Sequence, residues 1–250
     1  IRDSTWATRG APLPMDASPH VWVWLSLSGL AGFTIGDLCL FRAFVLVGAR
    51  VSMLMMTLVP LFTTVFGFLV MHELLTPKQI IGMALTIAGV SSVVLERRQD
   101  ANGRAERLPL IGVLLALCGA IGQSLGLVLA KFGMGRYDAF ASTQIRVLAG
   151  IIGFSVVFTV TGRWPRVRAA LRDRQAMTGT GIGAFFGPFI GVSLSLIAVQ
   201  YTEAGVAATL MALTPVLIIP VSVIFYREHV AWPAAVGAVV AVCGSALLFL

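Results

Sequence analysis

The strongest constraint on this chain is an internal repeat at a constant spacing of 155 residues. Pro60 recurs as Pro215 (215 − 60 = 155), and Glu73 recurs as Glu228 at the same spacing. Shared hydrophobicity would favour matches of Leu and Val, whereas many of these matches are Gly, Pro or Glu. Two parts of the chain are therefore predicted to share one fold. The other matched pairs are Gly32/Gly187, Ile35/Ile190, Gly36/Gly191, Ala49/Ala204, Val51/Val206, Met56/Met211, Leu58/Leu213, Gly82/Gly237, Gly89/Gly244 and Leu95/Leu250.

The composition places this repeat in a membrane. Apolar residues make up 58% of the chain, charged residues 12%, and the mean hydropathy is +0.92. These values leave too little polar surface for a soluble domain. Apolar stretches of about 17 to 23 residues suit a hydrocarbon core about 30 Å thick. We expect an all-α integral membrane protein, a polytopic bundle with about eight spans in this chain: 21–41, 51–71, 79–95, 108–130, 139–161, 177–199, 205–225 and 231–250.

The offset also predicts the organisation of the chain. Residues 21–96 hold three spans of a first repeat, residues 97–107 form a linker, and residues 108–250 hold five spans of a second repeat. Subtracting 155 from spans four and five gives positions that lie almost entirely before residue 1. With Ile rather than Met at position 1, we expect two further helices upstream, with residues 1–20 as the loop that follows them. Five helices per half would enter the membrane in opposite directions, and such inverted repeats are common in secondary transporters. A natural eight-helix chain is the alternative.

Several segments carry a resemblance to a known family. They are GDLCLFRAF (36–44), ARVSMLMMTLVPLF (49–62), HELLTPKQIIGMALTIAGV (72–90), GPFIGVSLSLIAVQYTEAGVAATLMALTPVL (187–217) and REHVAWPAAVGAVVAVCG (227–244). Over residues 25–250 the chain resembles EamA-like members of the drug/metabolite transporter superfamily, which have two five-helix halves. The resemblance implies a carrier in the bacterial plasma membrane that exports small organic solutes such as amino acids, other metabolites or drugs. The chain departs from the family in lacking the first two helices, which help to line the cavity there.

Asp37 and Arg42 are ionisable residues within the first span. Such groups are costly in lipid and usually face a bundle interior or a water-filled cavity. Five positions apart, they point about 140° away from each other on a helix, so they are a poor pair. Asp37 is expected to bind a cation, a substrate amine or a coupling proton, or else to form a helix-packing salt bridge. Arg42 is a second binding candidate, and the alternative is that it reaches the membrane surface.

Other polar residues within spans are candidates for binding a ligand. Arg146, beside Gln144, is expected to meet a substrate carboxylate or to pair with Asp37, unless it extends to lipid headgroups. Neutral hydrogen-bonding groups can orient a ligand, and they can equally join helices. The neutral candidates are Gln123, Ser193, Ser195 and Gln200.

The repeated residues have mainly structural interpretations. Glu73 and Glu228 are expected to end matched helices and to hold the loops that follow. Prolines inside spans remove backbone hydrogen bonds and kink helices, which suits either gates or static bends. Small-xxx-small glycines are expected to let helices approach closely. The prolines are Pro60, Pro215 and Pro220, and the glycines are Gly32, Gly36, Gly122, Gly126, Gly183, Gly187 and Gly191.

Neither a cofactor nor a metal site is expected. The three Cys residues and three His residues are scattered without metal-ligand spacing. The basic segment 162–175 is predicted to be a helix on anionic headgroups. No nucleic-acid motif accompanies the pI of about 10.2, so nucleic acid is not an expected partner.

The orientation in the membrane stays open. Loops on the side opposite to residues 1–20 carry more Lys and Arg, which predicts that this opposite side is cytoplasmic. The family resemblance implies that both ends of the chain are cytoplasmic instead.

The expected function is therefore secondary transport rather than catalysis, with a small solute, the lipid bilayer and a coupling proton as partners. A non-transporting membrane scaffold or regulatory subunit is one alternative. An intramembrane aspartyl protease is another, because Gly36-Asp37 and Tyr137-Asp138 resemble its GD and YD pairs. Their order is reversed, however, and Asp138 lies at a helix end.

Overall fold

The computed structural model describes residues 14, 16–96, 109–214, 216–217 and 232–247, and these form helices joined by loops and turns. The expected all-α architecture is confirmed. In chain order the elements are α2 (Pro19–Gly29), the π-helix η1 (Leu30–Gly36), α3 (Asp37–Met56), α4 (Val59–Met71), α5 (Pro77–Glu96), α6 (Leu110–Met134), α7 (Ala139–Val160), α8 (Trp164–Arg172), α9 (Arg174–Ala184), the π-helix η2 (Phe185–Gly191), α10 (Val192–Tyr201), α11 (Ala204–Met211) and α13 (Trp232–Leu247).

Among the described residues, five helical stretches are long and apolar enough to cross a membrane. They are Pro19–Gly48, Val51–Met71, Leu110–Met134, Ala139–Val160 and Arg174–Tyr201. A shorter apolar stretch, Val236–Leu247, lies in α13. The segment 218–231, which includes the end of the expected span 205–225, lies outside the described residues.

Side-chain caps explain where several helices begin. The hydroxyl of Ser18 accepts from the Val21 N–H at 3.4 Å, directly before Pro19 at the start of α2. Asp138 accepts from the Ala141 N–H at 2.9 Å and so caps α7. Such caps satisfy backbone donors that have no partner within the helix. The starts of α2 and α7 are therefore fixed by local hydrogen bonds.

The helix boundaries follow the 155-residue offset. The π-helices match at both ends, because η1 covers residues 30–36 and η2 covers residues 185–191 (185 − 30 = 155). The helices before them also match, with α2 starting at Pro19 and α9 at Arg174 (174 − 19 = 155). Since π-helices are rare, a matched pair of them is strong evidence that the repeat is structural.

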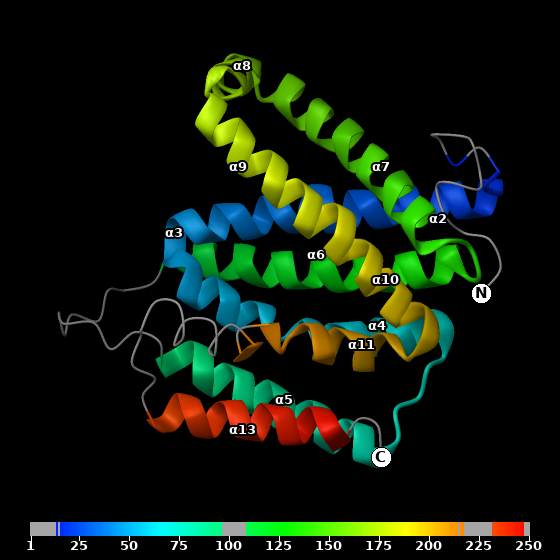
Figure 1. Ribbon diagram of the computed structural model, residues 1–250, viewed down its shortest axis with the longest axis vertical. Coiled ribbons are helices and arrows are strands. Elements are labelled where there is room, and N and C mark those ends of the chain that lie inside the picture. The colour runs from blue at the N-terminus through cyan, green and yellow to red at the C-terminus, as the bar shows by residue number, and fades with distance from the viewer. Residues whose placement is uncertain (1–13, 15, 97–108, 215, 218–231, 248–250) are drawn as a thin grey trace.

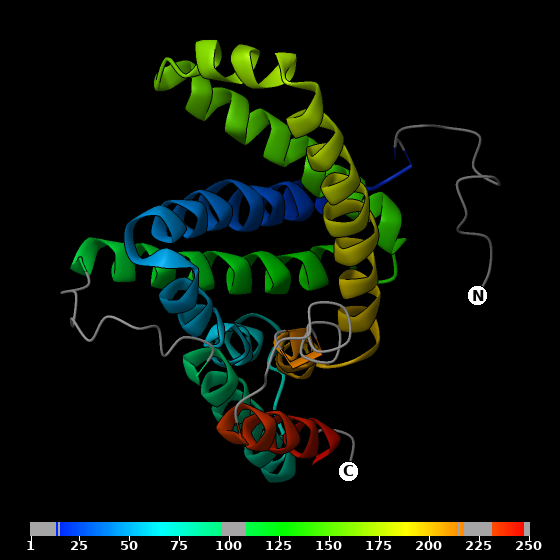
Figure 2. The same cartoon turned by 60° about the vertical axis from the view of Figure 1, so that its left-hand side comes forward.

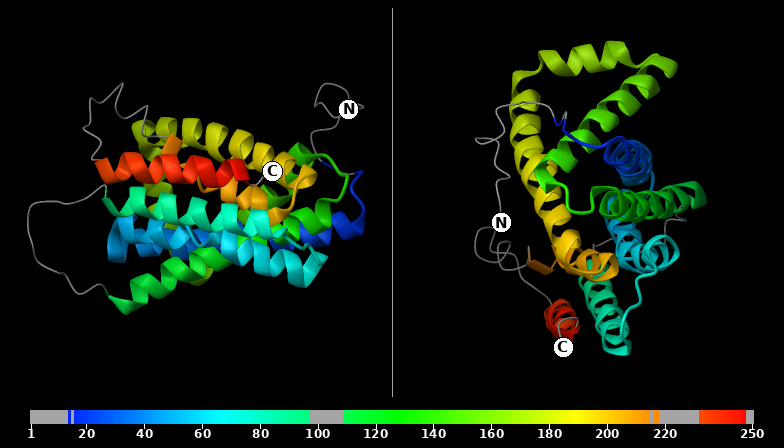
Figure 3. Two further views of the ribbon diagram at one scale, coloured as in Figure 1. Left: turned by 90° about the horizontal axis from the view of Figure 1, so that it is seen from below. Right: turned by 90° about the vertical axis from the view of Figure 1, so that its right-hand side faces the viewer.

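The two repeats meet in an antiparallel pair of helices, α5 and α13, which lie side by side in Figure 3. Thr86 donates its hydroxyl to the carbonyl oxygen of Ala241, its own counterpart at the 155 offset, at 3.4 Å. Gly89 packs against Gly237 and Ala241, and the matching residue Gly244 packs against Gly82 and Thr86. Reciprocal contacts of this kind are the signature of a two-fold axis. Gly82 lies near Gly244, whereas Gly89, further along α5, lies near Gly237, which comes earlier in α13. The two matched helices therefore run in opposite directions, as an inverted repeat requires.

Helix α6 of the second half packs on α2, η1 and α3 of the first half, as Figure 1 shows. Glycines on both sides make this contact close. A Cβ atom placed on Gly126 would lie 2.9 Å from the Cα of Gly32, and one placed on Gly122 would lie 2.8 Å from the Cα of Gly36. Ser28 donates a 2.5 Å hydrogen bond to the Gly126 carbonyl across the same interface. The expected packing role of these four glycines therefore agrees with the geometry.

In the second repeat, the glycine face that corresponds to Gly32 and Gly36 contacts no other helix in the described part of the chain. The last turns of α7 form, with α8 and α9, an arm that extends away from the bundle in Figure 2, whereas α7 up to Gly153 packs on α2 and η1. Gly183 and Gly187 have no described atom near the position of a Cβ, and Gly191 meets only an atom of its own helix. Their expected helix contacts are thus absent from the described structure. At the tip, α8 is an exposed basic helix within the segment 162–175.

The membrane helices are interrupted at matched positions. Gly48 has a non-helical conformation (φ 78°) that divides α3, and its counterpart Glu203 lies between α10 and α11. A turn at Thr57 and Leu58 follows, and the turn at 212–213 matches it. The expectation that Pro60 kinks a continuous helix is therefore corrected, because the helix ends before Pro60, which occupies the first turn of α4. A proline in a first turn breaks no helical hydrogen bond. Pro215 and Pro220 lie outside the described residues.

Glu73 connects the two repeats. Its carboxylate forms an ion pair with Lys131 of α6 and accepts from the Ala204 N–H at 2.9 Å, at the start of α11. Lys131 also donates to the Thr202 carbonyl at 2.5 Å. The backbone N–H of Glu73 also donates to the Gly67 carbonyl at 3.3 Å and so closes the end of α4. At the other end of the loop, the side chains of Thr76 and Gln79 each accept from the other's backbone N–H and so cap the start of α5. Glu228 lies outside the described residues.

The glycine contact on α6 gives a first prediction. Gly126→Val should lower the unfolding midpoint in detergent micelles by the equivalent of about 1–3 kcal/mol, because the new side chain would overlap the backbone of η1. The matched control is Gly187→Val, which enters open space on η2 and should leave the midpoint unchanged. Equal effects of the two substitutions would contradict the close α6 contact.

The Glu73 contacts give a second prediction. Glu73→Ala removes both a partner of a partly buried lysine and the cap of α11, and should cost about 1–3 kcal/mol of stability. Glu73→Gln keeps an acceptor for the Ala204 N–H and should cost less. Thermal unfolding of the two Glu73 variants checks that Glu73→Ala is the less stable of them. The control is Lys131→Met, which removes the other member of the ion pair. A fully stable Glu73→Ala variant would show that these contacts contribute nothing.

Candidate functional site

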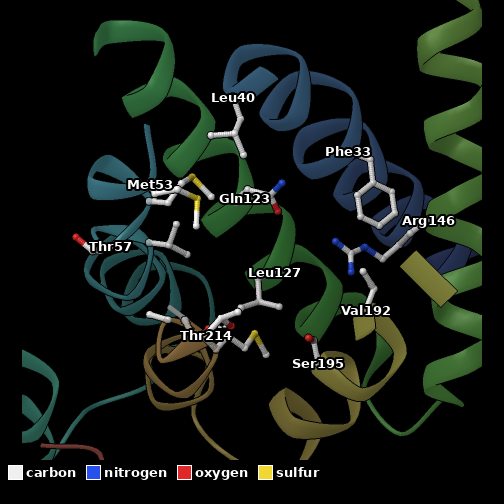
Figure 4. A pocket seen from close by; sticks show the side chains of 15 residues that line it. Phe33, Leu40, Met53, Thr57, Gln123, Leu127, Arg146, Val192, Ser195 and Thr214 are labelled. Carbon is white, nitrogen blue, oxygen red and sulfur yellow. Dashed lines mark hydrogen bonds between the residues drawn. The ribbon is translucent and has the colours of Figure 1, made fainter. Parts of the chain in front are cut away.

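A cavity of about 410 Å³ lies between the helices of the two repeats (Figure 4). Its wall is mostly apolar, and its only charged lining group within the described residues is Arg146. The volume is in the range of small-molecule sites. The lining residues are Phe33, Leu40, Met53, Met56, Thr57, Val59, Gln123, Leu127, Arg146, Val192, Ser195, Ala208, Met211, Ala212 and Thr214.

The wall of this cavity is built largely from matched residues of the two repeats. Five pairs of lining residues are related by the 155-residue offset. They are Leu40/Ser195, Met53/Ala208, Met56/Met211, Thr57/Ala212 and Val59/Thr214. A cavity lined by both members of each pair lies on the axis that relates the repeats. The same residues include Thr57 and Ala212, which lie in the matched turns between helices.

Arg146 is the most unusual group in the wall. Its side chain is only 4% exposed, and its guanidinium carbon lies 4.7 Å from the centre of the Phe33 ring. Its Nε is buried without a hydrogen-bond partner among the described residues. The side chain extends from α7 into the cavity, as Figure 4 shows.

Asp37 lies next to the cavity, behind Gln123. Its Oδ1 accepts from Gln123 Nε2 at 2.5 Å, and Gln123 itself lines the cavity. The expected pairing of Asp37 with Arg146 takes a weaker form. The two groups attract each other electrostatically without an ion pair within 4 Å. A carboxylate, an amide and a guanidinium from α3, α6 and α7 thus lie near one another at the site.

The remaining polar candidates divide between the cavity and the helix contacts. Ser195 lines the cavity, with its hydroxyl bonded to the Gly191 carbonyl at 2.9 Å. Ser193 instead bonds Thr143 of α7 at 3.0 Å, and Gln200 donates to two carbonyls of the α6–α7 loop at 3.0 and 3.1 Å. Gln144 is half-buried outside the cavity lining, and Arg42 is exposed on α3.

The structure also bears on the cysteines and on the protease alternative. Cys39 and Cys118 are not isolated, because their sulfur atoms lie 3.4 Å apart between α3 and α6. No group of three or more His, Cys, Asp and Glu suited to a metal ion is present in the described ranges.

The two carboxylates of the protease alternative have separate structural contacts. Asp138 caps α7, whereas Asp37 accepts a hydrogen bond from Gln123.

Sequence reasoning missed the apolar lining of the site. Phe33, Met53 and Met56 look like ordinary membrane-helix residues in the sequence. One signal was present, because Met56 and Met211 are identical at the 155-residue offset. A repeated methionine beside repeated helix breaks indicates a position near the axis. No comparable signal marks Phe33, whose counterpart is Pro188.

Comparison with known proteins places the chain among transporters. An uncharacterized transporter of Clostridium kluyveri is 23% identical over 222 residues, which cover 89% of this chain and 70% of the relative. The uncharacterized transporter YvbV of Bacillus subtilis is 28% identical over 170 residues, which cover 68% of this chain and 52% of the relative.

The fold is also similar to that of a protein of known crystal structure. The TM-score is 0.71 at 19% identity, over 96% of this chain and 79% of the other. The model of the EamA-like transporter family matches residues 5–95 and 110–250. An all-helical membrane bundle with an internal repeat agrees with that match, and this chain belongs to the EamA-like transporter family.

Proposed function

We propose that this protein is a secondary transporter that moves small organic solutes, as an exporter, across a bacterial plasma membrane. The observation that carries the proposal is the cavity wall built from five residue pairs related by the repeat. A site at the axis between inverted repeats can open to either side when one repeat moves against the other. The bacterial relatives named as transporters support the same proposal.

The interrupted helices supply points at which such a movement can occur. Gly48 divides α3, and the turns at 57–58 and 212–213 separate short helices on each side of the cavity. Thr57 and Ala212 line the cavity, so a change in either turn alters the wall directly. The glycine contacts of α5 with α13 lie at the axis and allow close helix packing. Movement of one repeat about this contact would expose the cavity to alternate sides.

The cavity gives a third prediction. Met211→Trp should fill part of the space and reduce solute efflux from proteoliposomes at least tenfold, because Met211 lines the cavity. The vesicles would be loaded with a panel of amino acids, other carboxylates, amines and neutral metabolites, and efflux would be followed by mass spectrometry. The control is Met177→Trp on the exposed face of α9, which should transport normally. If no solute leaves faster than from protein-free vesicles, the proposal is wrong.

Asp37 gives a fourth prediction, on coupling. We propose that Asp37 carries the coupling proton, since its carboxylate lies beside the cavity and faces Gln123 of α6 and the charge of Arg146 on α7. Asp37→Asn should abolish solute accumulation driven by an imposed pH gradient, while solute exchange without a gradient continues. Asp173→Asn, an exposed helix cap, is the control. An unchanged response to the pH gradient in the Asp37→Asn variant would remove Asp37 from the coupling mechanism.

A further inference from the structure

Arg146 is a buried cation whose hydrogen-bonding capacity is unused. Arginine carries five N–H donors in a planar fork. No hydrogen bond or ion pair joins this side chain to another residue in the described ranges, and its Nε is fully enclosed. Its one specific contact is the face of the Phe33 ring at 4.7 Å. Since a buried charge is costly unless it is paired, the site favours a partner that comes from outside the chain.

Asp37 does not satisfy this arginine. Its Oδ1 is bound by the Gln123 amide at 2.5 Å, and it forms no ion pair within 4 Å of Arg146. Gln123 thus holds the carboxylate on the α3 side of the site. The attraction of Asp37 lowers the cost of burying the Arg146 charge, but Asp37 does not occupy the guanidinium fork.

The surroundings leave room for a ligand at the fork. On the η1 side the fork is bordered by Gly32, which has no side chain. A Cβ atom placed on Gly32 would lie 3.5 Å from Arg146 Nη2 and 4.0 Å from Gln123 Oε1. On the α10 side the neighbouring cavity residue is Val192, which occupies the position equivalent to Asp37. Figure 4 shows Arg146 and Gln123 pointing into the same space from opposite sides.

The apolar part of the cavity wall favours a ligand with an apolar body. Leu127 and three methionines, Met53, Met56 and Met211, also line the cavity. Methionine side chains adapt to irregular apolar shapes. No Asp or Glu is among the lining residues of the described cavity, so nothing there would neutralise an ammonium group. A single guanidinium also matches one negative charge rather than two.

We propose that Arg146 binds the carboxylate of a monoanionic substrate, whose apolar body lies against the methionines and Leu127. A carboxylate fits the guanidinium fork with two parallel hydrogen bonds. This inference rests on the proposed transport function, because it names the substrate class of the same cavity. It assigns specificity for charge to one residue of the second repeat.

Binding to the purified chain in detergent micelles tests the inference without requiring transport. The probes are 3-phenylpropionate, 3-phenylpropanamide and 3-phenylpropylamine, which share one carbon skeleton and differ in charge. Isothermal titration calorimetry should give at least tenfold tighter binding of the carboxylate than of the amide or the amine. Arg146→Gln should abolish this preference, and Arg146→Lys should keep part of it, because an ammonium retains the charge but not the fork.

Two controls keep the result interpretable. Arg42→Gln removes an exposed arginine of the neighbouring helix and should leave carboxylate binding unchanged. The unfolding midpoint without ligand shows which Arg146 variants are folded, and Arg146→Lys supplies the test if Arg146→Gln does not fold. Equal binding of the three probes, or an unaltered carboxylate preference in a folded Arg146→Gln variant, would overturn the inference.

The outcome also separates this inference from the transport proposal. Carboxylate binding that depends on Arg146, together with an absence of flux for every solute in vesicles, would support the inference and refute transport. Rapid flux of amines or neutral solutes that Arg146→Gln does not alter, with no preference for carboxylates, would support transport and refute the inference.

Discussion

The close contact of α6 with η1 and α3 is the interaction on which the site depends. It brings helices of the two halves together at Gly122 and Gly126, where a side chain on α6 would collide with the backbone of η1. Only at this separation can Gln123, between those two glycines, reach Asp37 with a 2.5 Å hydrogen bond. In lipid, such contacts replace the hydrophobic driving force that water supplies to soluble proteins. The cavity wall is therefore a consequence of small residues rather than of large ones.

The repeat produces a symmetric scaffold with an asymmetric chemistry. The π-helices and the helix breaks follow the offset, and so do five pairs of lining positions. Most of the residues at those positions differ. Among the five pairs only Met56 and Met211 are identical, whereas Leu40 is matched by Ser195. Beside the cavity, Asp37 is matched by Val192. A symmetric frame can present the same cavity to both sides of a membrane, while unequal side chains fix the orientation of a ligand within it. In the proposed transporter, the symmetric helices would therefore allow the movement, and the unequal side chains would recognise the ligand.

The sequence predicted the parts of this fold that periodicity and repetition control. The 155-residue offset and the apolar spans anticipated the helix order, and 139–161 differs by one residue from the observed Ala139–Val160. It could not predict the break before Pro60, because a helix-period pattern continues through Thr57 and Leu58. For the site, ionisable residues within spans identified Asp37 and Arg146, since their cost in lipid requires an interior position. The same reasoning applied to Arg42, which is exposed on α3. Which face a charged residue occupies depends on neighbouring helices, and the order of residues along the chain does not reveal them.

The environment of Arg146 also connects recognition with movement. An empty cavity must keep water around the guanidinium, because its N–H groups have no described partner in the protein. Closing the repeats over a bare charge would remove that water at a cost of several kcal/mol. A bound carboxylate supplies the missing acceptors and cancels the charge, so closure around the loaded site avoids most of this cost. A carrier with such a site crosses between its two open states more easily with substrate than without it. In the proposed transporter, Arg146 would then act twice, first in selecting an anion and then in making closure depend on the bound anion.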